Sequence, residues 1–138
     1  MDYTIQTSVS GDFDEVVDAT IASLEDEGFG VLCDIDVQAT LEEKLGEEFQ
    51  QYRILGACNP ALAHEGITEE TELGALLPCN VIVYETDDRE VVVSAVDPHK
   101  LLGIADNEAL DGIATEVQER IERTLSAVTD DFEPASEA

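Results

Sequence analysis

The chain has 138 residues, enough for one domain with a single core, and contains no apolar run near the roughly 20 residues that a membrane-spanning helix needs. Its 33 acidic residues oppose six basic ones, and the net charge of -27 argues against direct binding to DNA or RNA, because phosphate contacts need clustered lysine and arginine. A hydrophobic content of 43% is too high for a disordered segment, so the composition predicts a folded acidic domain.

The first 28 residues predict a strand followed by a long helix. Residues 3–7 alternate apolar and polar side chains, a period typical of a strand. Apolar residues then recur at helical spacing over residues 13–24. Asp12 stands at the position of a helix cap, and Gly28 suits the left-handed residue that follows a helix end.

The middle of the chain predicts two further strands with a short helix between them. Residues 31–38 alternate strictly, and this pattern makes Cys33 a small core residue. Residues 41–45 can form a short helix closed by Gly46, and residues 51–58 then have the composition of a strand.

The last third predicts a hairpin and a second long helix. Residues 80–86 and 89–96 form two apolar runs that bracket a pair of aspartates, and such continuous runs are typical of central strands covered on each face. Asn107 can cap a helix whose apolar stripe extends from Leu110 to Val128. Residues 129–138 are acidic and without periodicity, and we expect a frayed tail there.

The order of these elements predicts a single α+β domain over residues 1–128. It would contain a mostly antiparallel sheet of about five strands, two long helices on one face and small helical inserts. The apolar runs of the hairpin leave the other face in need of a cover, and a second copy of the chain would supply it. We therefore expect a homodimer.

The acidic residues are distributed along the whole chain, and only two of the six basic residues are lysines. This composition resembles proteins of extreme halophiles, in which molar salt screens exposed carboxylates over about 3 Å. An acidic mimic of nucleic acid, or an acidic partner-binding surface, is the alternative, but acids of that kind are expected in one block. The first residues lack the features of a signal peptide, so we expect a cytoplasmic protein without membrane attachment.

Two cysteine–asparagine pairs, Cys58-Asn59 and Cys79-Asn80, stand out as a candidate site. Asn59 is a good helix cap, and Pro60 suits the first position of a helix that would end at Gly66. This structural interpretation does not account for the cysteine. A thiol beside a helix N-terminus has a lowered pKa, although the surrounding carboxylates would raise it, and a buried structural cysteine remains the alternative.

The two pairs could meet at one end of the sheet if their strands are neighbours. Asn59 and Asn80 would then add amide groups to the two thiols, and Glu72 a carboxylate, to form a small polar pocket. The alternative is that each asparagine only satisfies backbone groups at a turn, which is common for this residue.

The strings ILGACNPALA and ELGALLPCNVIVYE, followed by a strand ending in VDP, resemble the domain of unknown function 302 family over roughly residues 1–128. The resemblance implies a TATA-binding-protein-like fold with the order strand, helix, four strands, helix. It implies no established activity, cofactor or substrate.

Metal binding and catalysis receive little support from the sequence. Cys58, Cys79, His64 and His99 could supply soft ligands for zinc or copper, but no two of them have a recognised spacing. The usual nucleotide-binding, hydrolase and zinc-protease motifs do not occur. No cofactor can be named, and the sequence does not predict an enzyme.

Three functional hypotheses follow. The first is a site formed by Cys58, Asn59, Cys79, Asn80 and Glu72 that binds a small ligand or handles a thiol, a sulfur species or a soft metal. The second is a non-catalytic homodimeric interaction module with structural cysteines. The third is a thiol-dependent enzyme, in which Cys58 would be the nucleophile.

Overall fold

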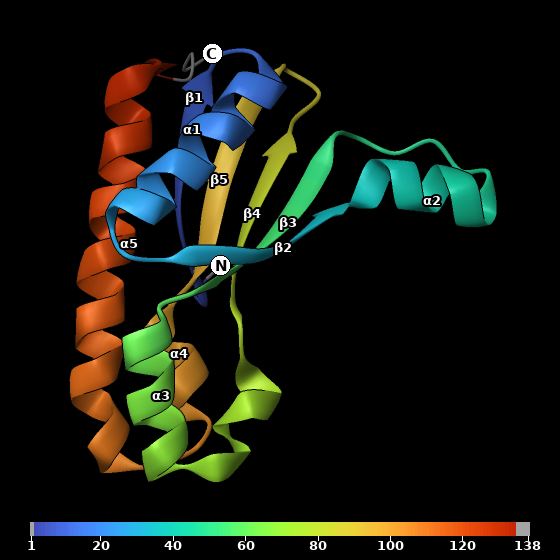
Figure 1. Ribbon diagram of the computed structural model, residues 1–138. Helices are drawn as coiled ribbons and strands as arrows, with labels where there is room; N and C mark the ends of the chain where they lie inside the picture. The colour runs from blue at the N-terminus through green and yellow to red at the C-terminus, as the bar shows by residue number, and fades with distance from the viewer. Residues whose placement is uncertain (1, 135–138) are drawn as a thin grey trace.

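The computed structural model describes residues 2–134 as an antiparallel sheet with helices packed against one face (Figure 1). The strands are β1 (Thr4–Ser10), β2 (Gly30–Asp36), β3 (Tyr52–Cys58), β4 (Cys79–Glu85), β5 (Glu90–Val96) and β6 (Glu133–Pro134). The helices are α1 (Phe13–Asp26), α2 (Val37–Leu45), α3 (Pro60–Glu69), α4 (Pro98–Gly103) and α5 (Asp111–Asp131), with the 3-10 helices η1 (Thr71–Leu76) and η2 (Glu108–Leu110).

The sheet has the strand order β2-β3-β4-β5-β1-β6, and this confirms the predicted antiparallel α+β class. The short strand β6 makes six strands where about five were expected. Strands β4 and β5 are central, as their apolar runs predicted. Val83 and Val93 face each other across the β4–β5 ladder, and neither side chain is exposed to solvent. This face of the sheet packs against α1 and α5 and forms the core.

The first helix begins and ends where the sequence predicts. The side chain of Asp12 accepts a hydrogen bond from the backbone N–H of Glu15 at 3.1 Å, and Gly28 adopts a φ of 85°. The guanidinium of Arg120 then donates to the carbonyl of Glu27 at 2.6 Å. This hydrogen bond ties the middle of α5 to the end of α1.

Strand β2 differs from its prediction because it contains a bulge. The register against β3 shifts at Leu32, an extra residue whose side chain is 68% exposed. After the bulge, Cys33 pairs with Gly56 and is exposed, whereas the alternating pattern placed it in the core. One inserted residue moves every following side chain to the opposite face of the sheet.

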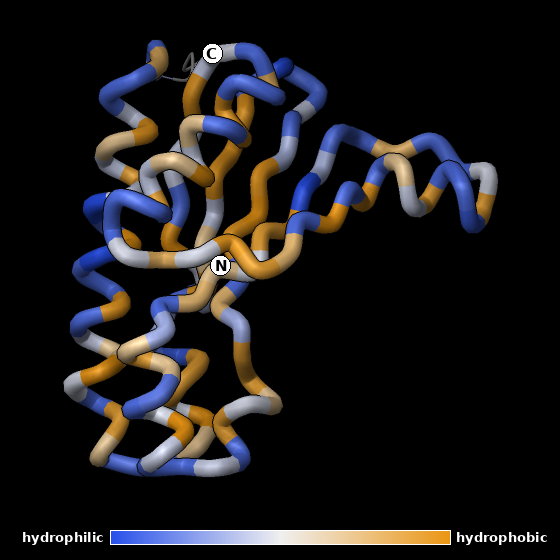
Figure 2. The backbone as a smooth tube through the Cα atoms, in the orientation of Figure 1, coloured by the Kyte–Doolittle hydropathy of each residue, from blue (hydrophilic) through white to orange (hydrophobic). Residues whose placement is uncertain are grey.

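The strand also ends earlier than expected, because a cap begins a helix at Val37. The side chain of Asp36 accepts from the backbone N–H of Ala39 at 2.9 Å. We call residues 37–51 the α2 arm. It projects away from α1 and α5 (Figure 1), and no residue of α2 is buried. The arm carries hydrophobic stretches among hydrophilic ones (Figure 2).

The described part of the expected tail is ordered. Helix α5 continues to Asp131, and β6 pairs with Val9 and Ser10 of β1. The hydroxyl groups of Thr129 and Thr7 are 2.8 Å apart, and Phe132 packs against the core. These contacts hold residues 129–134 in place, contrary to the expectation of fraying. The remainder of the expected tail, residues 135–138, lies outside the described residues.

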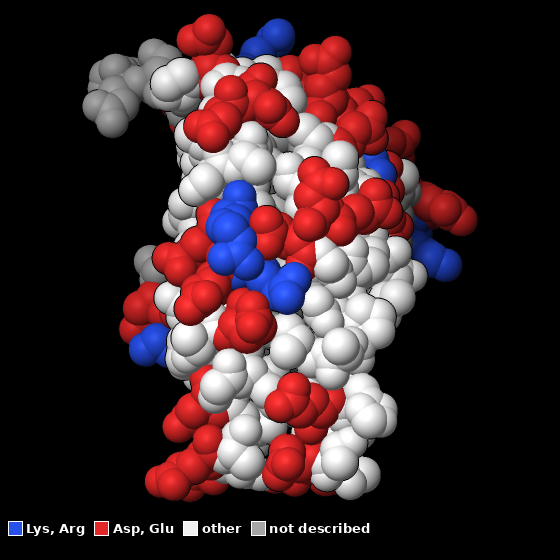
Figure 3. Space-filling view, turned by 60° about the vertical axis from the view of Figure 1, so that its left-hand side comes forward, with Lys and Arg blue, Asp and Glu red and all other residues white. Residues whose placement is uncertain are grey.

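Carboxylates cover the helical side of the molecule from end to end, and Lys and Arg side chains gather among them near the middle (Figure 3). Two arginines of α5 form ion pairs, Arg120 with Glu116 at 3.1 Å and Arg123 with Glu27 at 2.8 Å. Within residues 2–134, no helix combines the length and the apolar composition needed to cross a membrane.

Candidate functional site

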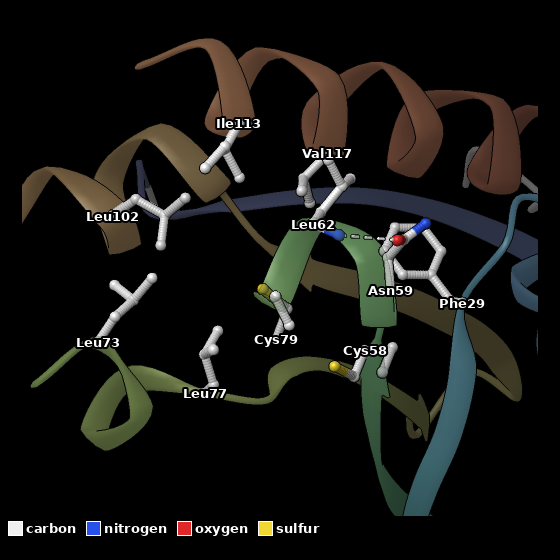
Figure 4. A pocket seen from close by; sticks show the side chains of 12 residues that line it. Phe29, Cys58, Asn59, Leu62, Leu73, Leu77, Cys79, Leu102, Ile113 and Val117 are labelled. Atoms are coloured by element: carbon white, nitrogen blue, oxygen red, sulfur yellow. Dashed lines mark hydrogen bonds between the residues drawn. The ribbon is translucent and has the colours of Figure 1, made fainter. Parts of the chain in front are cut away.

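A cavity of about 40 Å³ lies between the ends of β3 and β4 and the helices α3, α4 and α5 (Figure 4). Leu62, Leu102 and Val117 extend into it from these three helices in turn. Nine of the twelve lining residues have hydrocarbon side chains, and the other three are Cys58, Asn59 and Cys79. The volume has room for about three water molecules, or for a ligand of a few heavy atoms.

Both cysteines line this cavity, at the ends of two neighbouring strands. Ala57 pairs with Cys79, so Cys58 at the end of β3 lies next to the start of β4. The side chains of Cys58 and Cys79 are drawn among the lining residues in Figure 4. The Cys58 thiol is close enough to influence the titration of Cys79. Two residues that are 21 positions apart in the sequence therefore line one cavity, and we call this pair of cysteines the dithiol.

Cys79 is partly buried, and its protonation follows from this position. Burial raises the pKa of Cys79 to about 11, and the neighbouring Cys58 makes a smaller contribution in the same direction. The Cys79 sulfur is therefore a neutral thiol at neutral pH. It loses its proton only to a strong base or to a ligand that binds sulfur tightly.

Asn59 serves mainly as the cap of α3. Its side-chain oxygen accepts a hydrogen bond from the backbone N–H of Leu62 at 3.1 Å, and Pro60 occupies the first turn. Helix α3 continues past Gly66 to Glu69. Gly66 does not end the helix but lets it approach η1, since a Cβ there would lie 2.8 Å from a methyl group of Leu73.

The other predicted site residues do not line this cavity. Asn80 follows Cys79 in the same strand, so it points to the opposite face of the sheet and is exposed. Glu72 is exposed on η1. His64 is exposed on α3, and His99 lies on α4, where its Nε2 is 3.4 Å from the hydroxyl of Thr115. The structure therefore brings together three of the five predicted ligand-binding residues.

The sequence interpretation missed the hydrocarbon lining, for which Phe29 and Ile113 are examples. Apolar residues at these positions have the same pattern as core residues, and no signal in the sequence distinguishes the two. Among residues 2–134, no three or more Cys, His, Asp or Glu side chains are grouped as a metal site would require.

Replacing Asn59 by alanine should lower the free energy of unfolding by about 1 kcal/mol, because the first turn of α3 loses its cap. Asn80→Ala is the matched control and should change it by less than about 0.5 kcal/mol, since Asn80 is exposed. Urea unfolding in molar potassium chloride measures both values. Equal losses in the two variants would contradict the capping role.

The comparisons with known proteins cover this whole site. The model of the family described as domain of unknown function DUF302 matches residues 5–128. A solved structure, the crystal structure of an uncharacterized conserved protein DUF302 from Bacillus stearothermophilus, is similar with a TM-score of 0.86 and 30% sequence identity. That match covers 93% of this chain and 99% of the other. The comparison with curated proteins gave no match.

Proposed function

The chain belongs to the domain of unknown function DUF302 family. We propose that it binds a small uncharged ligand at the dithiol of Cys58 and Cys79. The proposal is supported above all by the presence of both cysteines in the lining of a cavity that is otherwise almost entirely hydrocarbon. Asn59 supports the site indirectly, because its oxygen is committed to the cap of α3.

The chemistry of the lining selects among the ligands that thiols bind. Soft metal ions and sulfur species are both suitable partners for sulfur. Transferring a charged ion into a hydrocarbon environment costs several kcal/mol unless it is paired with opposite charge. With Cys79 held as a neutral thiol at neutral pH, the cavity favours an uncharged sulfur species of a few heavy atoms.

Labelling of the three cysteines tests this proposal. Methyl methanethiosulfonate is small and uncharged. A thiolate attacks its sulfenyl sulfur, a methyl disulfide forms on the cysteine, and methanesulfinate leaves. In molar potassium chloride at pH 9, where a small fraction of Cys79 is ionised, and with detection by peptide mass, we expect this reagent to label Cys58 and Cys79 as well as the exposed Cys33. The bulkier, charged sulfonatoethyl analogue should label the two cavity cysteines at least tenfold more slowly relative to Cys33.

A filled cavity provides the matched control. In Ala63→Leu, a lining side chain is enlarged, so labelling of Cys58 and Cys79 by the small reagent should slow while that of Cys33 is unchanged. If the two reagents give the same ratio of rates at all three cysteines, the cavity does not select small ligands and the proposal fails.

A second candidate function, a protein-interaction module, is supported by the face of the sheet that lies away from α1 and α5, where Glu90 is the charged residue on β1, β3, β4 and β5. A salt-rich cytoplasm is the compartment we propose, because a net charge of -27 on 138 residues needs screening. Neither proposal depends on the cavity.

A further inference from the structure

The face of the sheet away from α1 and α5, which we call the open face, carries one charged residue on β1, β3, β4 and β5, namely Glu90 at the start of β5. Its other positions include the even-numbered residues within the ranges 4–8, 52–56, 80–84 and 92–96, which alternate with core residues along β1, β3, β4 and β5. These strand positions contain no Asp, Glu, Lys or Arg, although 33 of the 138 residues of the chain are acidic. An uncharged area of this size on so acidic a protein marks an interface.

The middle of the open face is apolar and aromatic. Ile54 and Ile82 face each other across the β3–β4 ladder, and the rings of Tyr52 and Tyr84 stack with their centroids 5.6 Å apart. A hollow of about 480 Å³ lies over these strands, and Tyr3, which is 54% exposed, forms part of its wall. The hollow has room for several side chains of a partner.

The α2 arm stands beside this hollow and contacts its own chain mainly at β3, where the ring centroids of Phe49 and Tyr52 are 6.0 Å apart. Gln50 of the arm lines the hollow together with Tyr52. Leu45 is 67% exposed at the end of α2, and Phe49 is 41% exposed. A helix with no buried residue is held only weakly by its own domain, since helices in proteins are stabilised mostly by packing of an apolar face.

We propose that a second copy of the chain covers the open face, so that two open faces pack together and each α2 arm reaches over the edge of the other sheet. The charge distribution identifies this partner. Two copies that each have a net charge of -27 repel each other wherever carboxylates meet, and the open face brings fewer carboxylates into contact than the helical side would. A charged partner would find little complementary charge there.

Geometry supports the same partner. A two-fold contact uses the same patch on both chains. Each chain must therefore carry both an α2 arm and an open face that the arm of the other chain can cover, and this chain carries both. The open face and the arm together provide the number of residues, about 20–30 a side, that stable interfaces use. The cavity with the dithiol lies on the helical side of the sheet, so this inference holds or fails independently of the proposed ligand.

Light scattering coupled to size-exclusion chromatography in 2 M potassium chloride tests the inference. The full chain should elute with twice its mass of 14.9 kDa. Ile82→Glu places a carboxylate in the middle of the open face and should give a monomer with an unchanged circular-dichroism spectrum. The matched variant Ile104→Glu, at a side chain that is 68% exposed outside the open face, should remain a dimer. A monomeric wild type, or two variants with the same mass, would overturn the proposal.

The contribution of the arm has a separate readout. Leu45→Glu should weaken dimerisation at least tenfold without loss of structure, because the Leu45 side chain is 67% exposed in its own chain. The dissociation constant of the wild type should also fall as potassium chloride is raised from 0.2 M to 2 M, because salt screens the repulsion between the two copies. If Leu45→Glu dimerises as the wild type does, the arm does not reach the partner.

Discussion

Raising the pH from 8 to above 11 should cost the protein about 2–3 kcal/mol of unfolding free energy through Cys79 alone. The thiol has a pKa of about 11 in the folded protein, against an ordinary value of 9.0. A raised pKa means that the folded state holds this proton more tightly than the unfolded state does. The stabilisation is therefore complete below pH 9 and is lost as the pH rises to 11, at about 1.36 kcal/mol for each pH unit.

The measurement compares the wild type with Cys79→Ala by urea unfolding in 2 M potassium chloride with a reductant, between pH 8 and 11. The variant is less stable at pH 8, because it leaves a small cavity, but the loss at high pH that belongs to Cys79 should be absent from it. Cys33→Ala removes an exposed thiol and is the control that should retain the loss. Parallel pH profiles of the wild type and Cys79→Ala would show that Cys79 is not the titrating group.

Transfer from 2 M to 0.1 M potassium chloride should remove most of the stability of the fold. The screening length grows to about 10 Å at 0.1 M, so the carboxylates that cover the helical side then repel one another across the whole surface. The expected loss is comparable with the total stability of a small domain, about 5–15 kcal/mol. Circular dichroism at graded salt concentrations measures the midpoint of this transition.

Two controls separate screening from other effects of salt. Sucrose at matched water activity does not screen charge, so it should restore less structure at 0.1 M salt than potassium chloride does. A variant with the exposed Asp18, Glu119 and Glu122 changed to their amides has a lower net charge and should fold at a lower salt concentration. If the variant and the wild type have the same salt midpoint, repulsion between carboxylates is not what destabilises the fold at low salt.

The long elements could be predicted because their signals are local. The cap at Asp12, the left-handed Gly28 and the apolar stripe of α5 each depend on neighbouring residues only. The bulge at Leu32 could not be predicted, because an inserted residue leaves the alternation of the sequence unbroken while it reverses the faces. The end of α5 was also missed, because Thr129 is held by Thr7, which is 122 residues away.

The candidate site shows the same division. The presence of Cys58 and Cys79 in one cavity depends on the pairing of β3 with β4. The sequence alone does not show which strands pair, so it predicts this arrangement only if the two strands are neighbours. The prediction that Asn80 shares a site with Cys79 is based on their adjacency in the sequence. Adjacent residues of a strand point to opposite faces of the sheet, so Asn80 does not line the cavity. The apolar lining was beyond the reach of the sequence, since a cavity is a gap between elements and not a property of any residue.

The two edges of the sheet affect how the protein should behave in concentrated salt. Unpaired edge strands invite other chains to add to them, and repulsion between like charges ordinarily opposes such growth. Once salt has removed that repulsion, the backbone itself must prevent filaments. At one end, the two residues of β6 cover part of β1. At the other end, the bulge of β2 interrupts the regular ladder that an incoming strand would need.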